Sequence, residues 1–171
     1  MSAARSGKAR TRIGAGQKIT PFLWFDGQAE EAARFYVSLF PGKGSKIEDV
    51  SHYPDGSAMA VSFRVAGQRF VALNGGPEYE HTPAMSLYID CATQAEVDAL
   101  WKKLCAGGGE PLMCGWVTDR FGVTWQVVPS GLPELLDSGG DPERAARVMK
   151  AMMKMKKLDM PKLEKAAAGR A

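Results

Sequence analysis

The chain has 171 residues, the length of one ordinary domain or of two small fused modules, and its content of 45% hydrophobic and 24% charged residues excludes a disordered chain. The net charge of +3 comes from the two ends: residues 1–18 carry five basic and no acidic groups, residues 141–171 carry nine basic and four acidic groups, and residues 19–140 are left with eight basic and fifteen acidic groups. This acidic body argues against a nucleic-acid partner, and the sequence has neither a run of about 20 apolar residues nor a signal-like start, so we expect a cytoplasmic protein that does not enter a membrane.

Four segments are expected along the chain. Composition and turn signals divide it into a mobile basic arm at 1–18, a first module at 19–80, a second module at 81–138 and a helical tail at 139–171. The arm is rich in Ser, Ala, Gly, Lys and Arg and has no apolar periodicity, which is typical of a mobile segment.

The first module begins with the dense apolar run 19–25, which predicts a buried strand. A helix over 28–40 follows, because apolar residues recur there at intervals of three and four, and Pro41 with Gly42 ends it. Turn residues then separate three further predicted strands, at 45–53, 57–66 and 68–74. The predicted order of this module is βαβββ.

The second module repeats this order in a shorter form. An alternating strand at 85–90 precedes a helix that Thr93 and Glu96 open as a capping box, and short strands are expected near 110–118 and 122–128. The tripeptide Gln-Ala-Glu stands at the start of both predicted helices, 66 residues apart, which suggests an internal duplication.

The tail is predicted to be helical. Asp-Pro at 141–142 is typical of a helix start, and a further short helix is expected near Asp159. Val148, Met152 and Met155 form an apolar stripe on the first of these helices. Because methionine is an adaptable packing residue, we expect the stripe to dock on the body or on a partner subunit rather than to recognise a separate target.

Several segments of the sequence carry a family resemblance: 24–32, 35–36, 74–77, 94–101 and, most specifically, 115–129. They resemble the PhnB-like family of the vicinal oxygen chelate (glyoxalase/bleomycin-resistance) superfamily, whose members often carry the label 3-demethylubiquinone-9 3-methyltransferase. The similarity runs from about residue 19 to 165. It implies an α+β fold in which paired βαβββ modules form a curled mixed sheet, with helices outside, a cleft between the modules, and homodimers.

Strand alternation then indicates which side chains would line that cleft. In the strand 85–90 the aliphatic residues should meet the helix, and the polar and aromatic residues should face the cleft. The positions 66 residues earlier, in and before the first strand, add Thr20, Phe22 and Trp24, and the last strands of the two modules add Asn74, Thr124 and Gln126. The predicted ligand-binding set is therefore Thr20, Phe22, Trp24, Asn74, Ser86, Tyr88, Thr124 and Gln126. Rings and neutral polar groups suit a small, partly aromatic or apolar ligand. In the alternative interpretation these groups satisfy one another in a closed core.

The residues do not favour the divalent metal that enzymes of the superfamily usually hold with His and Glu. At the corresponding positions stand Thr20, Ser86, Asn74 and Gln126, which are all neutral at pH 7 and bind a hard cation weakly. His52 and His81 belong to no metal-binding motif, and Asp90 and Asp119 could supply one ligand each. The three cysteines, Cys91, Cys105 and Cys114, are spaced neither as a disulfide framework nor as a zinc knuckle. We therefore predict no metal.

Three classes of function remain open. The first is a small-molecule binding protein or metal-free enzyme; no catalytic residue can be named. The second is an enzyme, either the methyltransferase of the family label or a metal-dependent glyoxalase- or dioxygenase-like enzyme. The glycine clusters at 75–76, 107–109 and 139–140 do not form the strand-to-helix turn of a nucleotide site, so S-adenosylmethionine has no support from the sequence. The third class is a protein-interaction module that uses the tail and the basic arm.

Overall fold

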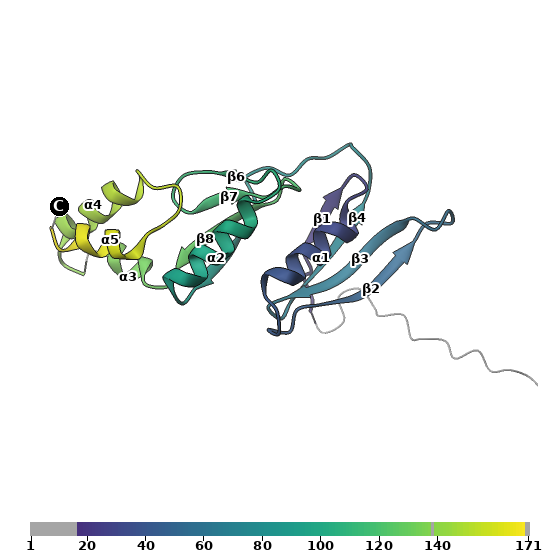
Figure 1. Ribbon diagram of the computed structural model, residues 1–171, viewed down its shortest axis with the longest axis horizontal. Coiled ribbons are helices and arrows are strands. Elements are labelled where there is room, and N and C mark those ends of the chain that lie inside the picture. The colour runs from purple at the N-terminus through teal and green to yellow at the C-terminus, as the bar shows by residue number, and fades with distance from the viewer. Residues whose placement is uncertain (1–16, 138, 170–171) are drawn as a thin grey trace, which may run out of the picture. The chain divides into compact units, whose positions relative to one another are not determined.

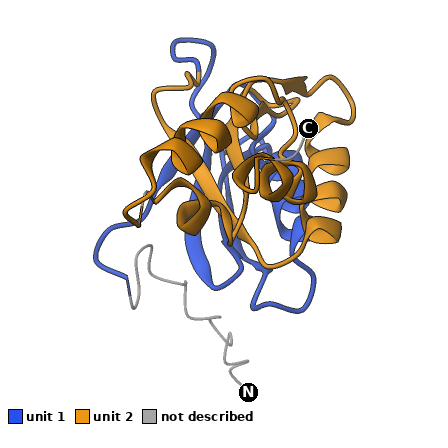
Figure 2. Ribbon diagram, turned by 90° about the vertical axis from the view of Figure 1, so that its left-hand side faces the viewer, with its two compact units in different colours: residues 1–80 blue, residues 81–171 orange. Residues whose placement is uncertain are grey.

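The computed structural model describes residues 17–137 and 139–169. The chain divides into two compact units, Met1–Glu80 and His81–Ala171, which Figure 2 shows in different colours. The predicted basic arm lies outside the described residues except for Gln17 and Lys18. Among the described residues no helix combines the length and the apolar character that crossing a lipid bilayer requires.

The first unit is one helix on one four-stranded sheet (Figure 1). Its elements are β1 (Phe22–Phe25), α1 (Ala29–Leu39), β2 (Lys46–His52), β3 (Ala58–Val65) and β4 (Gln68–Asn74). The strand order is β1-β4-β3-β2, in which β1 runs parallel to β4 and the other neighbours are antiparallel. The helix buries its small residues and Tyr36 against the sheet, where Tyr36 meets the ring of Phe63, and Phe63 stacks on Phe70.

The second unit repeats this plan with shorter strands. It contains β5 (Ser86–Cys91), α2 (Gln94–Cys105), β6 (Glu110–Pro111), β7 (Trp116–Thr118) and β8 (Thr124–Pro129). The strand order β5-β8-β7-β6 matches that of the first unit, and β5 is again parallel to β8. The same element order and strand pairing in both units agree with the predicted duplication.

The predicted start of α2 is confirmed. The side chain of Thr93 accepts a hydrogen bond from the backbone N–H of Glu96 at 3.1 Å, and the Glu96 carboxylate accepts one from the N–H of Ala92 at 3.0 Å. The cap, two residues after the end of β5, fixes the start of the helix. From this start, Val97 and Leu100 are buried in the core of the unit.

The tail forms three helices, α3 (Leu132–Leu136), α4 (Pro142–Met152) and α5 (Met160–Ala167), and packs on the second unit. Its buried core consists of Val128, Leu132, Val148, Leu158 and Leu163, with Met152 and Met155 packed around it. Docking of the predicted apolar stripe on the body is therefore confirmed, whereas α3 was not predicted.

Backbone hydrogen bonds add to this docking. The N–H groups of Cys114 and Gly115 each donate to a tail carbonyl, of Met155 and Lys156, at 2.7 Å. The side chain of Gln94, at the first position of α2, bonds both to the carbonyl of Leu158 and to the N–H of Met160. The segment between α4 and α5 is thus fixed on the body at two places.

The α+β class, the paired βαβββ order and the helical tail are confirmed. Among the described residues, hydrogen bonds define two four-stranded mixed sheets, one in each unit, instead of the one curled mixed sheet that was expected. One face of each sheet is covered by α1 or α2 (Figure 1), and the opposite face is here called the helix-free face; in the second sheet the end of this face, at Val128, packs against the tail. The predicted site residues are distributed over these faces.

Candidate functional site

The helix-free face of the second sheet gathers four of the predicted residues. Strand register places Ser86 beside Thr124 and Tyr88 beside Gln126, and residues paired across neighbouring strands point to the same face. The Gln126 amide donates to Ser86 Oγ at 2.8 Å, and the hydroxyl of Thr124 lies 3.4 Å from that of Thr118. We call Ser86, Tyr88, Thr118, Thr124 and Gln126 the β5–β8 face.

Tyr88 is the exposed aromatic residue of the β5–β8 face, with 54% of its surface accessible. Tyr88 pairs in register with Gln126, whose side chain is itself only partly buried. Partial burial, followed by the charge interactions with Asp90 and Cys91, raises the pKa of Tyr88, so the phenol is neutral at pH 7 and can both donate and accept a hydrogen bond. The face therefore offers a ring and neutral polar groups to a ligand.

Aromatic residues also occupy the helix-free face of the first sheet. Phe22 is 53% exposed and Trp24 is half-buried. The alternate residues of the strand, Leu23 and Phe25, are buried on the side of α1. Trp24 donates its indole N–H to the carbonyl of Gly76 at 2.7 Å and meets Tyr79 edge to face, with ring centroids 5.0 Å apart. These contacts fix the indole against the sheet.

Thr20 lies two residues before Phe22, just outside β1. Its hydroxyl oxygen is buried and has no hydrogen-bond partner among the described residues. A buried hydroxyl without a partner costs free energy, so this oxygen is available to a ligand atom or to water.

Asn74 is not on the same face as the other predicted residues, and this part of the prediction was wrong. Register pairs Asn74 with Phe25, on the side that carries α1. Its side-chain oxygen accepts the N–H of Ala29 at 2.8 Å, and its amide donates to the carbonyl of Ala58 at 2.9 Å. Asn74 thus serves the start of α1.

The error lies in the matching of the two closing strands. Val71 pairs with Phe22 as Gln126 pairs with Tyr88, so Val71 is the counterpart of Gln126 in the first unit. The middle of β4 is apolar on both of its faces, with Phe70, Val71 and Ala72 all buried, so alternation could not reveal which residues face which side.

A charged cluster on the first sheet was missed by the sequence analysis. Glu48 accepts hydrogen bonds from Arg64 at 2.8 Å and from Arg69 at 2.7 Å. The side chain of Arg69 is only 5% exposed and that of Glu48 8%. Arg64 and Arg69 pair in register and lie on the side of Phe22 and Val71. The sequence held one indication of this cluster, since Arg64 and Arg69 stand within strands that are otherwise largely apolar.

Burial raises the pKa of Glu48, but the hydrogen bonds of Arg69 and Arg64 and their charges outweigh it, so the pKa lies below its usual value. The carboxylate is ionised at pH 7 and binds both arginines. The first sheet therefore carries a structural ion cluster at the position where the second sheet carries the hydroxyls of Thr118 and Thr124.

Asp119, one of the two carboxylates that could have held a metal, is fully occupied. One of its oxygens accepts the N–H groups of Phe121 and Val123, and the other accepts the indole N–H of Trp125 at 2.8 Å. Asp119 is 3% exposed, so it orders the turn before β8 and fixes the ring of Trp125 under α2. Trp125 is a buried packing residue.

The sequence profile of the family described as 3-demethylubiquinone-9 3-methyltransferase matches residues 17–128, which is more than half of the chain. The chain belongs to this family. The match covers both βαβββ units and ends within β8, so it leaves out the tail. No curated protein matches.

Solved structures of the family and its surroundings agree with this assignment. A PhnB protein from Bacillus cereus is 39% identical, with 64% of this chain and 97% of that chain covered and a TM-score of 0.59. Protein PA1353 from Pseudomonas aeruginosa is 26% identical, with 63% and 92% covered and a TM-score of 0.51. The predicted PhnB-like resemblance is confirmed.

The side chains present in this family member do not fit the divalent metal that the superfamily resemblance implies. Ser86 and Gln126 are neutral and bonded to each other, Thr20 is neutral, and Val71, the counterpart of Gln126, has no ligand atom. A hard cation needs carboxylate or imidazole ligands to offset its dehydration. Within 17–137 and 139–169, no three His, Cys, Asp or Glu side chains come close enough together to hold a metal ion.

Proposed function

We propose that this family member binds a small, partly aromatic or apolar organic molecule on its β5–β8 face, and that it does so without a divalent metal. The observation that carries the proposal is the exposed Tyr88 beside the Gln126–Ser86 hydrogen bond, on the sheet face opposite α2, whose end at Val128 packs against the tail. A ring that stacks and a few neutral polar groups that orient are typical of a small-molecule site.

The chemistry of the face favours a neutral ligand. Tyr88, Gln126 and the hydroxyls of Ser86, Thr118 and Thr124 carry no charge at pH 7, and Asp90 on the same strand side adds a negative charge. An anionic ligand would meet repulsion there, whereas a phenol, a quinone or an alcohol could exchange hydrogen bonds with the Gln126 amide.

The test is binding of small neutral phenols and benzoquinones, measured by ligand-observed NMR on the wild-type chain and on Tyr88→Ala and Gln126→Leu. We expect each substitution to weaken the tightest ligand about tenfold, because a lost ring stack or hydrogen bond is worth about 1 to 1.5 kcal/mol. Met85→Ala is the matched control, since Met85 is exposed and directly precedes β5. Equal affinities in all four proteins would refute the proposal.

The activity in the family's description is the second candidate, favoured by the match over residues 17–128. It needs a site for a methyl donor. The glycines at 75–76 follow β4 and lead into a loop, so they do not form a nucleotide-binding turn before a helix. Calorimetric titration with S-adenosylmethionine distinguishes the two candidates. Binding at micromolar concentration would favour methyl transfer, whereas the absence of binding heat would favour the small-molecule binding function.

We further propose that the chain forms homodimers, as its family resemblance implies, and that it works in the cytoplasm, as expected from its sequence. Light scattering on the full chain tests the dimer. A mass near twice 18.5 kDa is expected, and a mass near 18.5 kDa over the micromolar range would contradict it.

A further inference from the structure

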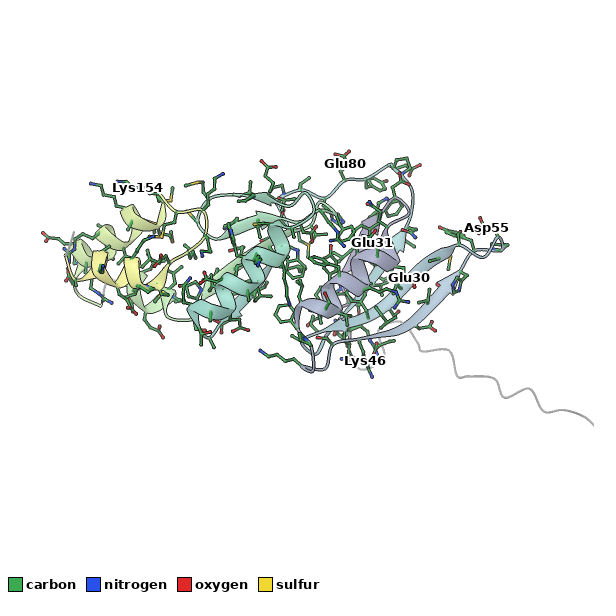
Figure 3. All side chains as sticks on the ribbon, viewed as in Figure 1. Glu30, Glu31, Lys46, Asp55, Glu80 and Lys154 are labelled. Carbon is green, nitrogen blue, oxygen red and sulfur yellow. The ribbon has the colours of Figure 1, made fainter. Side chains whose placement is uncertain are left out.

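A basic groove runs between α4 and α5 of the tail, outside every face considered for the proposed function. Its volume is about 660 Å³, within the range of roughly 300 to 1,000 Å³ that is usual for small-molecule sites. The lining combines four cations with an apolar floor and includes no acidic residue: Arg147, Lys150, Lys154 and Lys162 above Ala151 and Met155. Figure 3 shows Lys154 at the outer edge of the tail, extending away from the ribbon.

Three of the cations follow one face of α4 and its C-terminal continuation. Arg147, Lys150 and Lys154 are spaced by three and four residues, which makes them neighbours on a helix. Like charges at these spacings repel each other by a few tenths of a kcal/mol per pair. The helix dipole favours one cation in the last turn, where Lys150 stands, but it does not account for the whole row.

These charges are only partly neutralised within the described residues. Arg147 donates to the carbonyls of Ala166 and Ala167 at the end of α5, and Lys162 pairs with Asp159 at 3.0 Å. The side-chain ammonium groups of Lys150 and Lys154 have neither a hydrogen bond nor an ion pair with any residue in the described ranges 17–137 and 139–169. Both are exposed, so their ammonium groups can approach a ligand without the loss of an existing partner.

We propose that this groove is a second binding site and that it takes a small organic polyanion, of which a phosphate ester is the type. Ammonium groups act as point charges for phosphate oxygens, and the floor of Ala151 and Met155 would receive an apolar part of the same molecule. The groove has the size for a small ligand, and the net negative charge of residues 19–140 opposes a long nucleic-acid backbone. The site differs in charge from the neutral β5–β8 face, so the two proposals stand or fall separately.

Calorimetric titration of the full chain with pyrophosphate and with phenyl phosphate tests the site. The wild-type chain is expected to bind both, phenyl phosphate with the help of the floor, and the double variant Lys150→Gln/Lys154→Gln is expected to bind each at least tenfold more weakly. The variant should fold normally, because both lysines are exposed and their removal relieves repulsion. Thermal unfolding with pyrophosphate gives a second measurement, since a ligand that binds the native state raises Tm.

The matched control is Lys102→Gln/Lys165→Gln, which removes the same charge from exposed positions outside the groove. It should keep wild-type affinity at the same ionic strength. Equal weakening in both double variants would show general charge attraction and overturn the proposal, as would wild-type protein that binds neither probe. Binding to vesicles with anionic lipid but to neither soluble probe would also overturn it, in favour of a membrane surface.

Discussion

The side-chain amide of Asn74 ties three elements of the first unit together. From the end of β4 it accepts the first N–H of α1 and donates to the carbonyl at the start of β3. Gln28, at the N-cap position of α1, makes no side-chain cap, so Asn74 supplies the acceptor that a helix start requires.

Asn74→Ala should therefore destabilise the protein by about 1 to 2 kcal/mol, the usual cost of a lost cap together with an unpaired carbonyl. Urea denaturation followed by circular dichroism measures this. Gln28→Ala is the control and should stay within about 0.5 kcal/mol of wild type. An equal loss in both variants would contradict the role given to Asn74.

Glu48 predicts a dependence of stability on pH. Its pKa in the folded state lies below the unfolded value, so its contribution is present above the unfolded pKa and is lost as the pH falls through the folded pKa. Glu48→Gln should cost about 1 to 3 kcal/mol at pH 7, because two arginines lose a charged acceptor. The difference from wild type should shrink in urea titrations below about pH 4. A difference that stays constant down to pH 3 would show that the charge of Glu48 does not matter.

At this scale the sequence was informative where one strand face was aliphatic and the other polar. In β5 the alternation of Leu87 and Ile89 with Ser86 and Tyr88 correctly indicated which residues share a face. In β4 both faces are apolar, so the position of Asn74 depended on a register that alternation does not encode. The sequence did not predict the Glu48 cluster, because Arg64 and Arg69 lie far from Glu48 along the chain and meet it only when the strands pair.

At the scale of elements, the tail is a structural part of the second unit. Leu158 lies between α4 and α5, is fully buried, and fills the space next to Gly115, where a Cβ atom would meet its side chain at 2.8 Å. The helix starts at Asp141 and Asp159 were predictable from local capping, because each aspartate accepts an N–H three residues later. The docking site of the tail depends on distant contacts that no local pattern encodes.

Leu158→Ala should cost about 2 to 5 kcal/mol, the range for a large buried residue that leaves a cavity. The tail should loosen first, so hydrogen exchange at the amides of Cys114 and Gly115, which bond to tail carbonyls, should speed up. Met149→Ala, at an exposed position of α4, should leave both measurements unchanged. Unaltered exchange at the two amides in Leu158→Ala would contradict this account of the docking.

At the scale of the whole molecule, the two units share one strand order but carry different side chains on their helix-free faces. The shared strand order places Phe22 and Tyr88 at corresponding positions, but their partners are Val71 in one unit and Gln126 in the other. The first face ends in a closed ion cluster, whereas the second keeps its hydroxyls and amide near an exposed ring. This difference between the two faces is the reason why we propose the ligand site on the second unit.

The most direct test is a chemical-shift map of the isotope-labelled chain, recorded with the tightest-binding phenol or quinone and with EDTA present. We predict that the largest shifts fall on Ser86, Tyr88, Thr124 and Gln126 and that EDTA leaves the affinity unchanged. Shifts confined to the α2-covered side of the same strands, or binding that appears only after a divalent cation is added, would contradict the proposed metal-free site.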